Sequence, residues 1–178
     1  MRSTIDGSVV ESRYDSILAG LTPEIRTGAV AWYRDAERFA ESLTIVRPEW
    51  TVEIAASVMS ALSPRERWES NKAKALTFAR GGIVRGLGMN LRNARNATRE
   101  GFAALRGCKT NAFARAIAGD PNAVVIDTWM LKPIDRRTVT PAQYGIIAST
   151  VVRCAARVNL TPRETQAAIW IIARGAAE

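Results

Sequence analysis

Hydrophobic residues recur along the chain at the three- and four-residue spacing of amphipathic helices. This spacing predicts a short first helix near residues 8–20 and a second helix that opens at Thr22-Pro23-Glu24 and carries an apolar stripe from Ile25 to Leu43. A third helix is predicted over residues 52–62, with Thr51 as its cap. Because this third segment is apolar nearly all round, we expect it to be buried.

Four of the seven prolines directly follow a serine or threonine, at positions 22, 63, 140 and 161. A hydroxyl residue followed by proline is typical of a helix N-terminus, and a Glu or Gln three residues after the hydroxyl completes a capping box. The pattern therefore predicts helices that begin near residues 23, 64, 141 and 162. No alternating strand pattern occurs, so we predict an all-α chain of about seven to ten helices, forming a single compact domain over residues 1–178.

Composition excludes several classes of protein. The chain has 178 residues and no histidine, which excludes Ser-His and Cys-His catalysis and every His-ligated metal site. Two cysteines, Cys108 and Cys154, cannot form a four-cysteine zinc or iron–sulfur site, and we expect free thiols rather than a disulfide. We expect no metal, no cofactor and no membrane span, and we predict a cytoplasmic protein (in the host cytoplasm if the chain is viral).

Charge points to a polyanionic partner, because the formal net charge is +8. Residues 80–115 hold eight basic residues and one acid, Glu100, which gives this segment a net charge of +7. The eight are Arg80, Arg85, Arg92, Arg95, Arg99, Arg106, Lys109 and Arg115. A charge run is often only a solvated face, but such faces usually mix signs. We therefore predict that this segment binds nucleic acid, with phosphate contacts that position a duplex.

The stretch from Leu105 to Trp129 carries the candidate chemistry. Lys109 stands at a glycine-containing helix start, where free N–H groups bind phosphate. Asp127 follows the apolar run Ala123–Ile126. Lys109 is either a phosphate contact or a nucleophilic amine, and Asp127 is either a helix N-cap or a catalytic carboxylate. Trp129 either packs in the core or flanks a pocket.

These residues resemble the helix-hairpin-helix superfamily of DNA glycosylases, typified by endonuclease III. The family pattern L-P-G-h-G-x-K-T-A, followed by a short helix and h-h-h-D-T-H, is similar to residues 105–110 and 123–129 here. Residues 59–63 and 71–73 look like the family's L-S-A-Q-T and N-K-A motifs, and residues 86–97 look like the segment before the hairpin. The resemblance covers about residues 50–135, and its hairpin and catalytic segment spans residues 99–131.

The resemblance implies a role for each matching position. Lys109 would attack C1′ of the sugar and form a Schiff base, Asp127 would take a proton and stabilise positive charge, and the base would first be flipped out of the duplex. Leu62 and Trp129 would line the base pocket. The residues expected to contact DNA are Arg92, Arg95, Arg99, Arg106, Gly107, Cys108, Thr110 and Arg115.

The chain also departs from the family pattern. Its hairpin is two residues shorter and has one of the two glycines, Leu62 replaces glutamine, Trp129 replaces histidine, and the iron–sulfur cysteines are absent. These departures indicate a divergent branch, as found in phages. Three functions follow: a DNA glycosylase-like enzyme, a base-modifying transferase on the same fold, or a DNA-binding module that has lost the chemistry.

Overall fold

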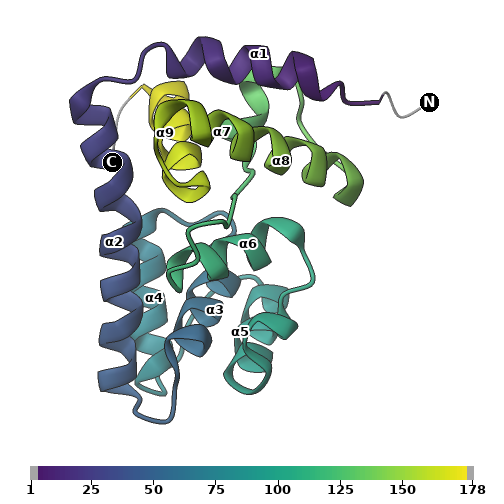
Figure 1. Ribbon diagram of the computed structural model, residues 1–178. Helices are drawn as coiled ribbons and strands as arrows, with labels where there is room; N and C mark the ends of the chain where they lie inside the picture. Colours follow the sequence, from purple (N-terminus) through teal and green to yellow (C-terminus); the bar gives the residue numbers. More distant parts are fainter. Residues whose placement is uncertain (1–3, 176–178) are drawn as a thin grey trace. The chain divides into compact units, whose positions relative to one another are not determined.

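The computed structural model describes residues 4–175, and nine α-helices and two short 3₁₀ helices are present in this range (Figure 1). No strand occurs in these residues, so the all-α prediction is confirmed, and the number of helices lies in the predicted range. In chain order the elements are α1 (Gly7–Leu18), α2 (Pro23–Val46), α3 (Val52–Leu62), α4 (Trp68–Ala79), α5 (Gly88–Glu100), η1 (Gly101–Ala104), α6 (Cys108–Ile117), α7 (Thr128–Leu131), η2 (Lys132–Ile134), α8 (Pro141–Val158) and α9 (Pro162–Arg174).

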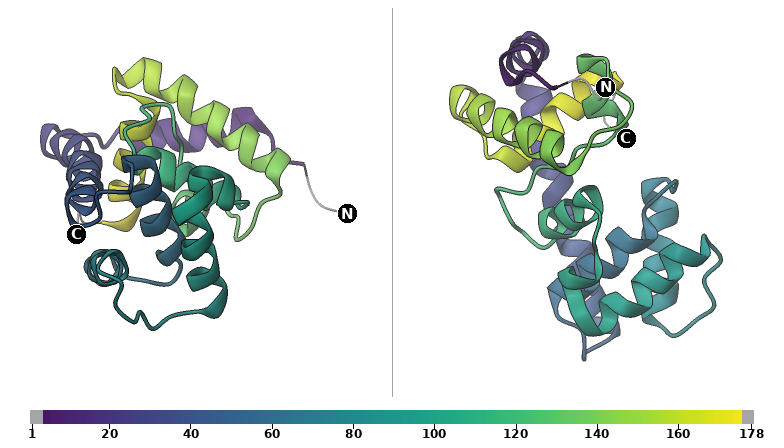
Figure 2. Two further views of the ribbon diagram at one scale, coloured as in Figure 1. Left: turned by 90° about the horizontal axis from the view of Figure 1, so that it is seen from below. Right: turned by 90° about the vertical axis from the view of Figure 1, so that its right-hand side faces the viewer.

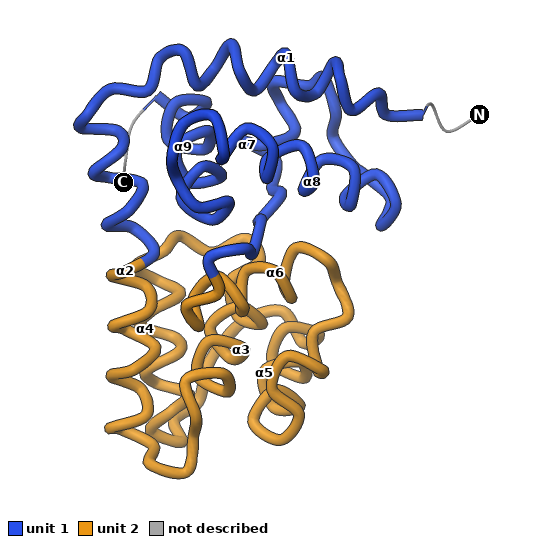
Figure 3. The backbone as a smooth tube through the Cα atoms, in the orientation of Figure 1, with its two compact units in different colours: residues 1–33, 121–178 blue, residues 34–120 orange. Residues whose placement is uncertain are grey.

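The helices form two compact units (Figure 3). Unit 1 comprises residues 1–33 and 121–178, and unit 2 comprises residues 34–120. Unit 2 is therefore continuous in sequence, whereas unit 1 is assembled from both ends of the chain. The expectation of a single domain over residues 1–178 stays a prediction.

Unit 1 is built around the packing of α1 against α8 and α9, and α1 lies beside α8 in Figures 1 and 2. Tyr14 on α1 is fully buried, and its hydroxyl donates a 2.8 Å hydrogen bond to the carbonyl of Met130. Burial raises the pKa of Tyr14 above its ordinary value. The core of this unit is closed by Ile147 and Val151 of α8 and Ile169 of α9, all fully buried.

Side-chain capping begins several of these helices where the sequence predicts it. Thr140 and Thr161 each accept a hydrogen bond from the backbone N–H three residues on, and Gln143 and Glu164 reciprocate, so both capping boxes are present. Thr51 likewise accepts from the N–H of Ile54 at 3.2 Å and begins α3. Each such cap satisfies N–H groups that the first helical turn leaves free.

The predicted helix start at Ser63-Pro64 is wrong, because α4 begins at Trp68. Ser63 instead ends α3, and its hydroxyl donates to the carbonyl of Ser60 at 2.9 Å. Arg65 has a φ of 68°, which is incompatible with a right-handed helix at that residue. Glu66 accepts hydrogen bonds from Ser70 and Lys74 rather than folding back to a capping position. Lys74 lies eight residues away, so a pattern of four residues could not reveal this competing contact.

Unit 2 is organised around α3, which packs against α4, α5, α6 and η1. Residues 55–62 of α3 are all buried, which confirms the prediction of a buried helix. Two polar contacts fix its neighbours. The hydroxyl of Ser60 donates to the carbonyl of Thr110 on α6 at 2.7 Å, and Glu53 accepts a 3.0 Å hydrogen bond from the N–H of Phe102 at η1. The start of α6 is thus held against the buried helix.

Candidate nucleic-acid interface

The start of α6 presents backbone donors that no side chain of the described residues caps. Gly107 precedes the helix in an extended conformation and, because it has no side chain, cannot cap the first turn. Asn111 is the first residue whose N–H bonds back, to the carbonyl of Gly107 at 2.9 Å. Cys108 and Lys109 are exposed, so the first N–H groups of this ten-residue helix can receive an anion.

Asn111 holds the turn that precedes α6. Its side-chain amide donates to the carbonyls of Phe102 and Leu105 at 3.0 and 3.2 Å, and its oxygen accepts from Arg115 at 2.9 Å. The Arg115 guanidinium also lies 4.7 Å from the centre of the Phe102 ring. No sequence pattern assigns Asn111 a role, so this positioning role is a finding of the structure. Arg115, a predicted DNA contact, is exposed but already bound within the turn.

All eight basic residues of positions 80–115 are exposed, and we call this set the basic surface. Among the described residues only Arg99 pairs with a carboxylate, that of Glu100 at 3.9 Å. The basic surface lies wholly in unit 2. Its members on α5 are Arg92, Arg95 and Arg99, and those on or directly before α6 are Arg106, Lys109 and Arg115. The structure therefore brings every predicted DNA contact into one unit.

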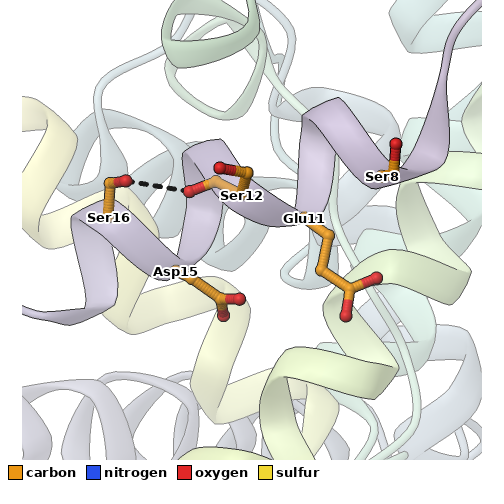
Figure 4. Close-up of a pocket in the computed structure, with 5 residues that line it drawn as sticks. All are labelled: Ser8, Glu11, Ser12, Asp15 and Ser16. Carbon is orange, nitrogen blue, oxygen red and sulfur yellow. Dashed lines mark hydrogen bonds between the residues drawn. The ribbon is translucent and has the colours of Figure 1, made fainter.

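In unit 1, by contrast, two arginines of α8 form ion pairs with acids of α1. Arg153 and Arg157 of α8 bind the carboxylate of Glu11, each at 2.7 Å, and Arg157 also binds Asp15 at 2.9 Å. These hydrogen bonds from Arg153 and Arg157 lower the pKa of Glu11. A hollow along α1 is lined by these two acids and by Ser8, Ser12 and Ser16 (Figure 4). Because its acids are already paired, this hollow is not a candidate for chemistry.

Lys109, the predicted nucleophile, is the second residue of α6 and is exposed. Its amine forms no ion pair with any carboxylate of residues 34–120. Because Lys109 is exposed, its amine is accessible to a phosphate or a sugar.

Asp127 belongs to unit 1 and acts as the N-cap of α7. One carboxylate oxygen accepts from the N–H groups of Trp129 and Met130 at 2.9 and 3.1 Å, and the other accepts from the indole N–H of Trp170 at 3.0 Å. The interpretation of Asp127 as a helix cap is therefore confirmed. The apolar run before it is buried, as expected, and Tyr144 anchors this run by donating to the carbonyl of Val124 at 2.7 Å.

The Trp170 indole that binds Asp127 makes further ring contacts within unit 1. The Trp170 ring lies 6.3 Å from that of Trp32, and the guanidinium of Arg174 lies 4.8 Å from the Trp170 ring centre. Trp129 is half-buried under the amine of Lys132, 3.5 Å from its ring centre. Sequence reasoning missed Trp170, since no local pattern links it to an aspartate 43 residues earlier.

The predicted base-pocket residues fall in different units. Leu62 is the last residue of α3 in unit 2 and is 3% exposed, whereas Trp129 is in unit 1. Lys109 and Asp127 are likewise divided between unit 2 and unit 1. The base pocket stays a prediction.

Over residues 4–175, no three His, Cys, Asp or Glu side chains group in a way that could hold a metal ion. Within the same range no helix has the length and apolar character needed to cross a bilayer. Neither the curated proteins nor the solved structures contain a match to the chain. The model of one family matches residues 13–177, which is most of the chain. The chain therefore belongs to DUF7178, a family of unknown function.

Proposed function

We propose that the chain binds DNA through the basic surface and acts on a base in that DNA, as a DNA glycosylase does. The observation that supports this proposal is the charge of unit 2. Seven of the eight exposed cations in residues 80–115 have no carboxylate partner among the described residues. Unpaired surface cations bind DNA by displacing counterions from its phosphates. Arg153 and Arg157 in unit 1 differ from these seven cations, because both form ion pairs with Glu11.

The start of α6 supports a particular phosphate contact. Its free N–H groups at residues 108–110 and Lys109 belong to the same first turn of the helix, where the helix dipole favours an anion. A phosphate bound there would position the DNA without reading its sequence. Asn111 and Arg115 would keep the turn in shape for it.

The proposed chemistry uses Lys109 and Asp127 in the roles that the family resemblance implies. The Lys109 amine forms a bond to C1′ of the sugar, and the base departs with the electrons of the glycosidic bond. Proton loss from nitrogen and opening of the sugar ring then give an imine. The Asp127 carboxylate stabilises positive charge on the sugar and accepts a proton. Three N–H donors fix the orientation of that carboxylate.

A second candidate function is DNA binding without chemistry. The observation that favours it is that both carboxylate oxygens of Asp127 already accept hydrogen bonds within unit 1. A carboxylate that serves only as a helix cap needs no substrate. The two candidates share the basic surface and differ in whether a covalent intermediate forms.

Borohydride trapping separates these candidates. The protein is incubated with a duplex containing an abasic site, and sodium borohydride reduces any imine to a stable adduct. We expect an adduct with the wild type and none with Lys109→Arg, which keeps the positive charge but has no nucleophilic amine at neutral pH. Binding without an adduct in the wild type would support the binding module. An adduct in Lys109→Arg would place the nucleophile elsewhere.

The salt dependence of binding tests the interface itself. If all eight cations contact phosphates, the logarithm of the binding constant falls against the logarithm of salt concentration with a slope as steep as about −7. Arg92→Ala should reduce the magnitude of this slope by roughly 0.9. Absence of DNA binding at low salt would overturn the proposal. Mass spectrometry of nucleosides from DNA co-expressed with the protein would reveal a base-modifying transferase instead.

A further inference from the structure

Unit 2 contains a pocket that includes neither Lys109 nor any residue of α6. Its walls come from the turn between α2 and α3, the end of α4, the following loop and one face of α5, and its volume is about 450 Å³. Small-molecule and cofactor sites usually have volumes of roughly 300–1,000 Å³. The pocket is therefore large enough for a ligand, and neither the family resemblance nor the predicted site residues assign it one.

The wall of the pocket includes apolar and aromatic side chains beside its polar ones. Trp50, which is 5% exposed, and the half-buried Phe78 have ring centres 6.2 Å apart and planes tilted by 37°, and Leu91 of α5 also lines the pocket. Ile83, on the loop after α4, also lines the pocket, and this residue is 93% exposed. Leu87 and Met89, which follow on the same segment, are 49% and 68% exposed. The segment from Ile83 to Met89 therefore exposes three large apolar side chains, of which Ile83 lines the pocket.

Two arginines flank the apolar part. Arg47 lies 5.8 Å from the Trp50 ring centre, donates to the carbonyl of Ala79 at 3.3 Å and pairs with Glu49, so its charge is largely used within the protein. Arg95 of α5 lines the pocket and is exposed, and no carboxylate of the described residues pairs with it. Arg92 and Arg99 continue the positive charge along the same helix. A ligand that fits combines a flat, largely apolar ring with a negative charge at Arg95.

We propose that this pocket accepts an unpaired nucleobase, with the adjacent phosphate at Arg95. The inference rests on the proposed DNA binding and deepens it, because it assigns a preference for DNA with an unpaired or single-stranded nucleotide. A base inside a duplex is stacked and paired and cannot enter a pocket. Proteins that bind single strands combine a cationic groove with apolar or aromatic surfaces for bases, as this pocket does. A polyanion also fits better than an acidic peptide, because the cations extend beyond the pocket along α5.

The test compares two DNAs that differ only in an unpaired tail. Fluorescence anisotropy measures the affinity of the protein for a short duplex and for the same duplex with a single-stranded thymidine tail. Stacking of one base is worth about 1–3 kcal/mol, so we expect the tailed DNA to bind about 5- to 150-fold more tightly. Thr98→Trp should remove this preference, because Thr98 lines the pocket and a tryptophan there fills it. The matched control is Ala73→Trp, which places the same side chain on an exposed position of α4 outside the pocket.

A second pair of variants separates the pocket from general charge. Arg95→Ala and Arg92→Ala each remove one exposed cation from α5, but only Arg95 lines the pocket. Arg92→Ala should weaken binding of both DNAs equally, whereas Arg95→Ala should also reduce the preference for the tail. Equal affinity of the wild type for both DNAs would overturn the inference and leave the proposed DNA binding intact. Failure to bind either DNA would overturn both.

Photocrosslinking tests the same inference without any substitution. The wild-type protein is irradiated with a tail that contains 4-thiothymidine, and the modified peptide is identified by mass spectrometry. We expect the crosslink within residues 47–50 or 78–98, the segments that line the pocket. A crosslink confined to other residues would overturn the inference, even if Thr98→Trp proves too unstable to measure.

Discussion

The indole N–H of Trp170 donates a 3.0 Å hydrogen bond to the Asp127 carboxylate, joining α9 to the residue that begins α7. Trp170→Phe keeps an aromatic ring but removes this donor. Because hydrogen bonds to charged groups contribute about 1.5–3 kcal/mol, we expect the free energy of unfolding to fall by that amount in urea denaturation. A double-mutant cycle with Asp127→Ala isolates the bond. If Trp170→Phe lowers the free energy of unfolding as much in the Asp127→Ala variant as in the wild type, the hydrogen bond does not stabilise the protein.

Gly101 is required by the backbone at the join of α5 and η1. Its φ of 53° and ψ of −131° lie in a region that residues with a side chain avoid, and a Cβ there would collide with the Glu53 carboxylate. Gly101→Ala should therefore destabilise the protein by about 1–3 kcal/mol. Gly86→Ala is the matched control, because Gly86 has no positive φ and a Cβ there meets no atom within 4 Å. Equal melting temperatures for the two variants would contradict this explanation.

Glu11 makes the stability of unit 1 sensitive to acid. Its hydrogen bonds to Arg153 and Arg157 lower its pKa below the ordinary value of 4.5. A carboxylate with a lowered folded-state pKa contributes stability above its unfolded pKa, and this contribution is lost as the pH falls through the folded value. The wild type should thus melt at a higher temperature than Glu11→Gln at pH 7, and the difference should shrink below pH 4.5. A difference that stays constant down to pH 2 would contradict this assignment.

The two cysteines should differ in reactivity. Cys108 is exposed at the start of α6, whereas Cys154 is buried in α8 and its pKa is raised to about 11 by burial and by the nearby Asp15. At pH 8 we expect one thiol per chain to react rapidly with Ellman's reagent and the second to react only after denaturation. Cys108→Ser should remove the rapid phase. Two rapid phases in the wild type, or none, would contradict the structure.

Local chemistry made much of the fold predictable. The capping boxes at Thr140 and Thr161 involve contacts only three residues apart, so the sequence shows both partners of each contact. The same pattern failed at Ser63, because Glu66 is engaged by Lys74 and Arg65 adopts a left-handed conformation. Whether a capping pattern forms a cap depends on competing partners outside the four residues.

The candidate site was predictable only where it is continuous in sequence. The basic surface occupies residues 80–115, so the sequence showed its charge, and the fold then kept every member exposed. The contact between Trp170 and Asp127 and the amide bridge of Asn111 depend on tertiary packing, which helical periodicity does not encode. The pocket beside Arg95 combines four separate segments of unit 2 and could be found only in the folded chain.

The order in which the chain supplies its two units has a consequence for synthesis. Unit 2 is complete once residue 120 has left the ribosome, whereas α1 packs against α8 and α9, which are translated after unit 2. The apolar face of α1 therefore lacks its packing partners while more than a hundred residues are synthesised. Unit 2 can fold cotranslationally during that interval, and unit 1 can fold only after α8 and α9 have left the ribosome. A ribosome stalled after α6 would hold a nascent chain whose basic surface is already formed and whose first helix is still unprotected.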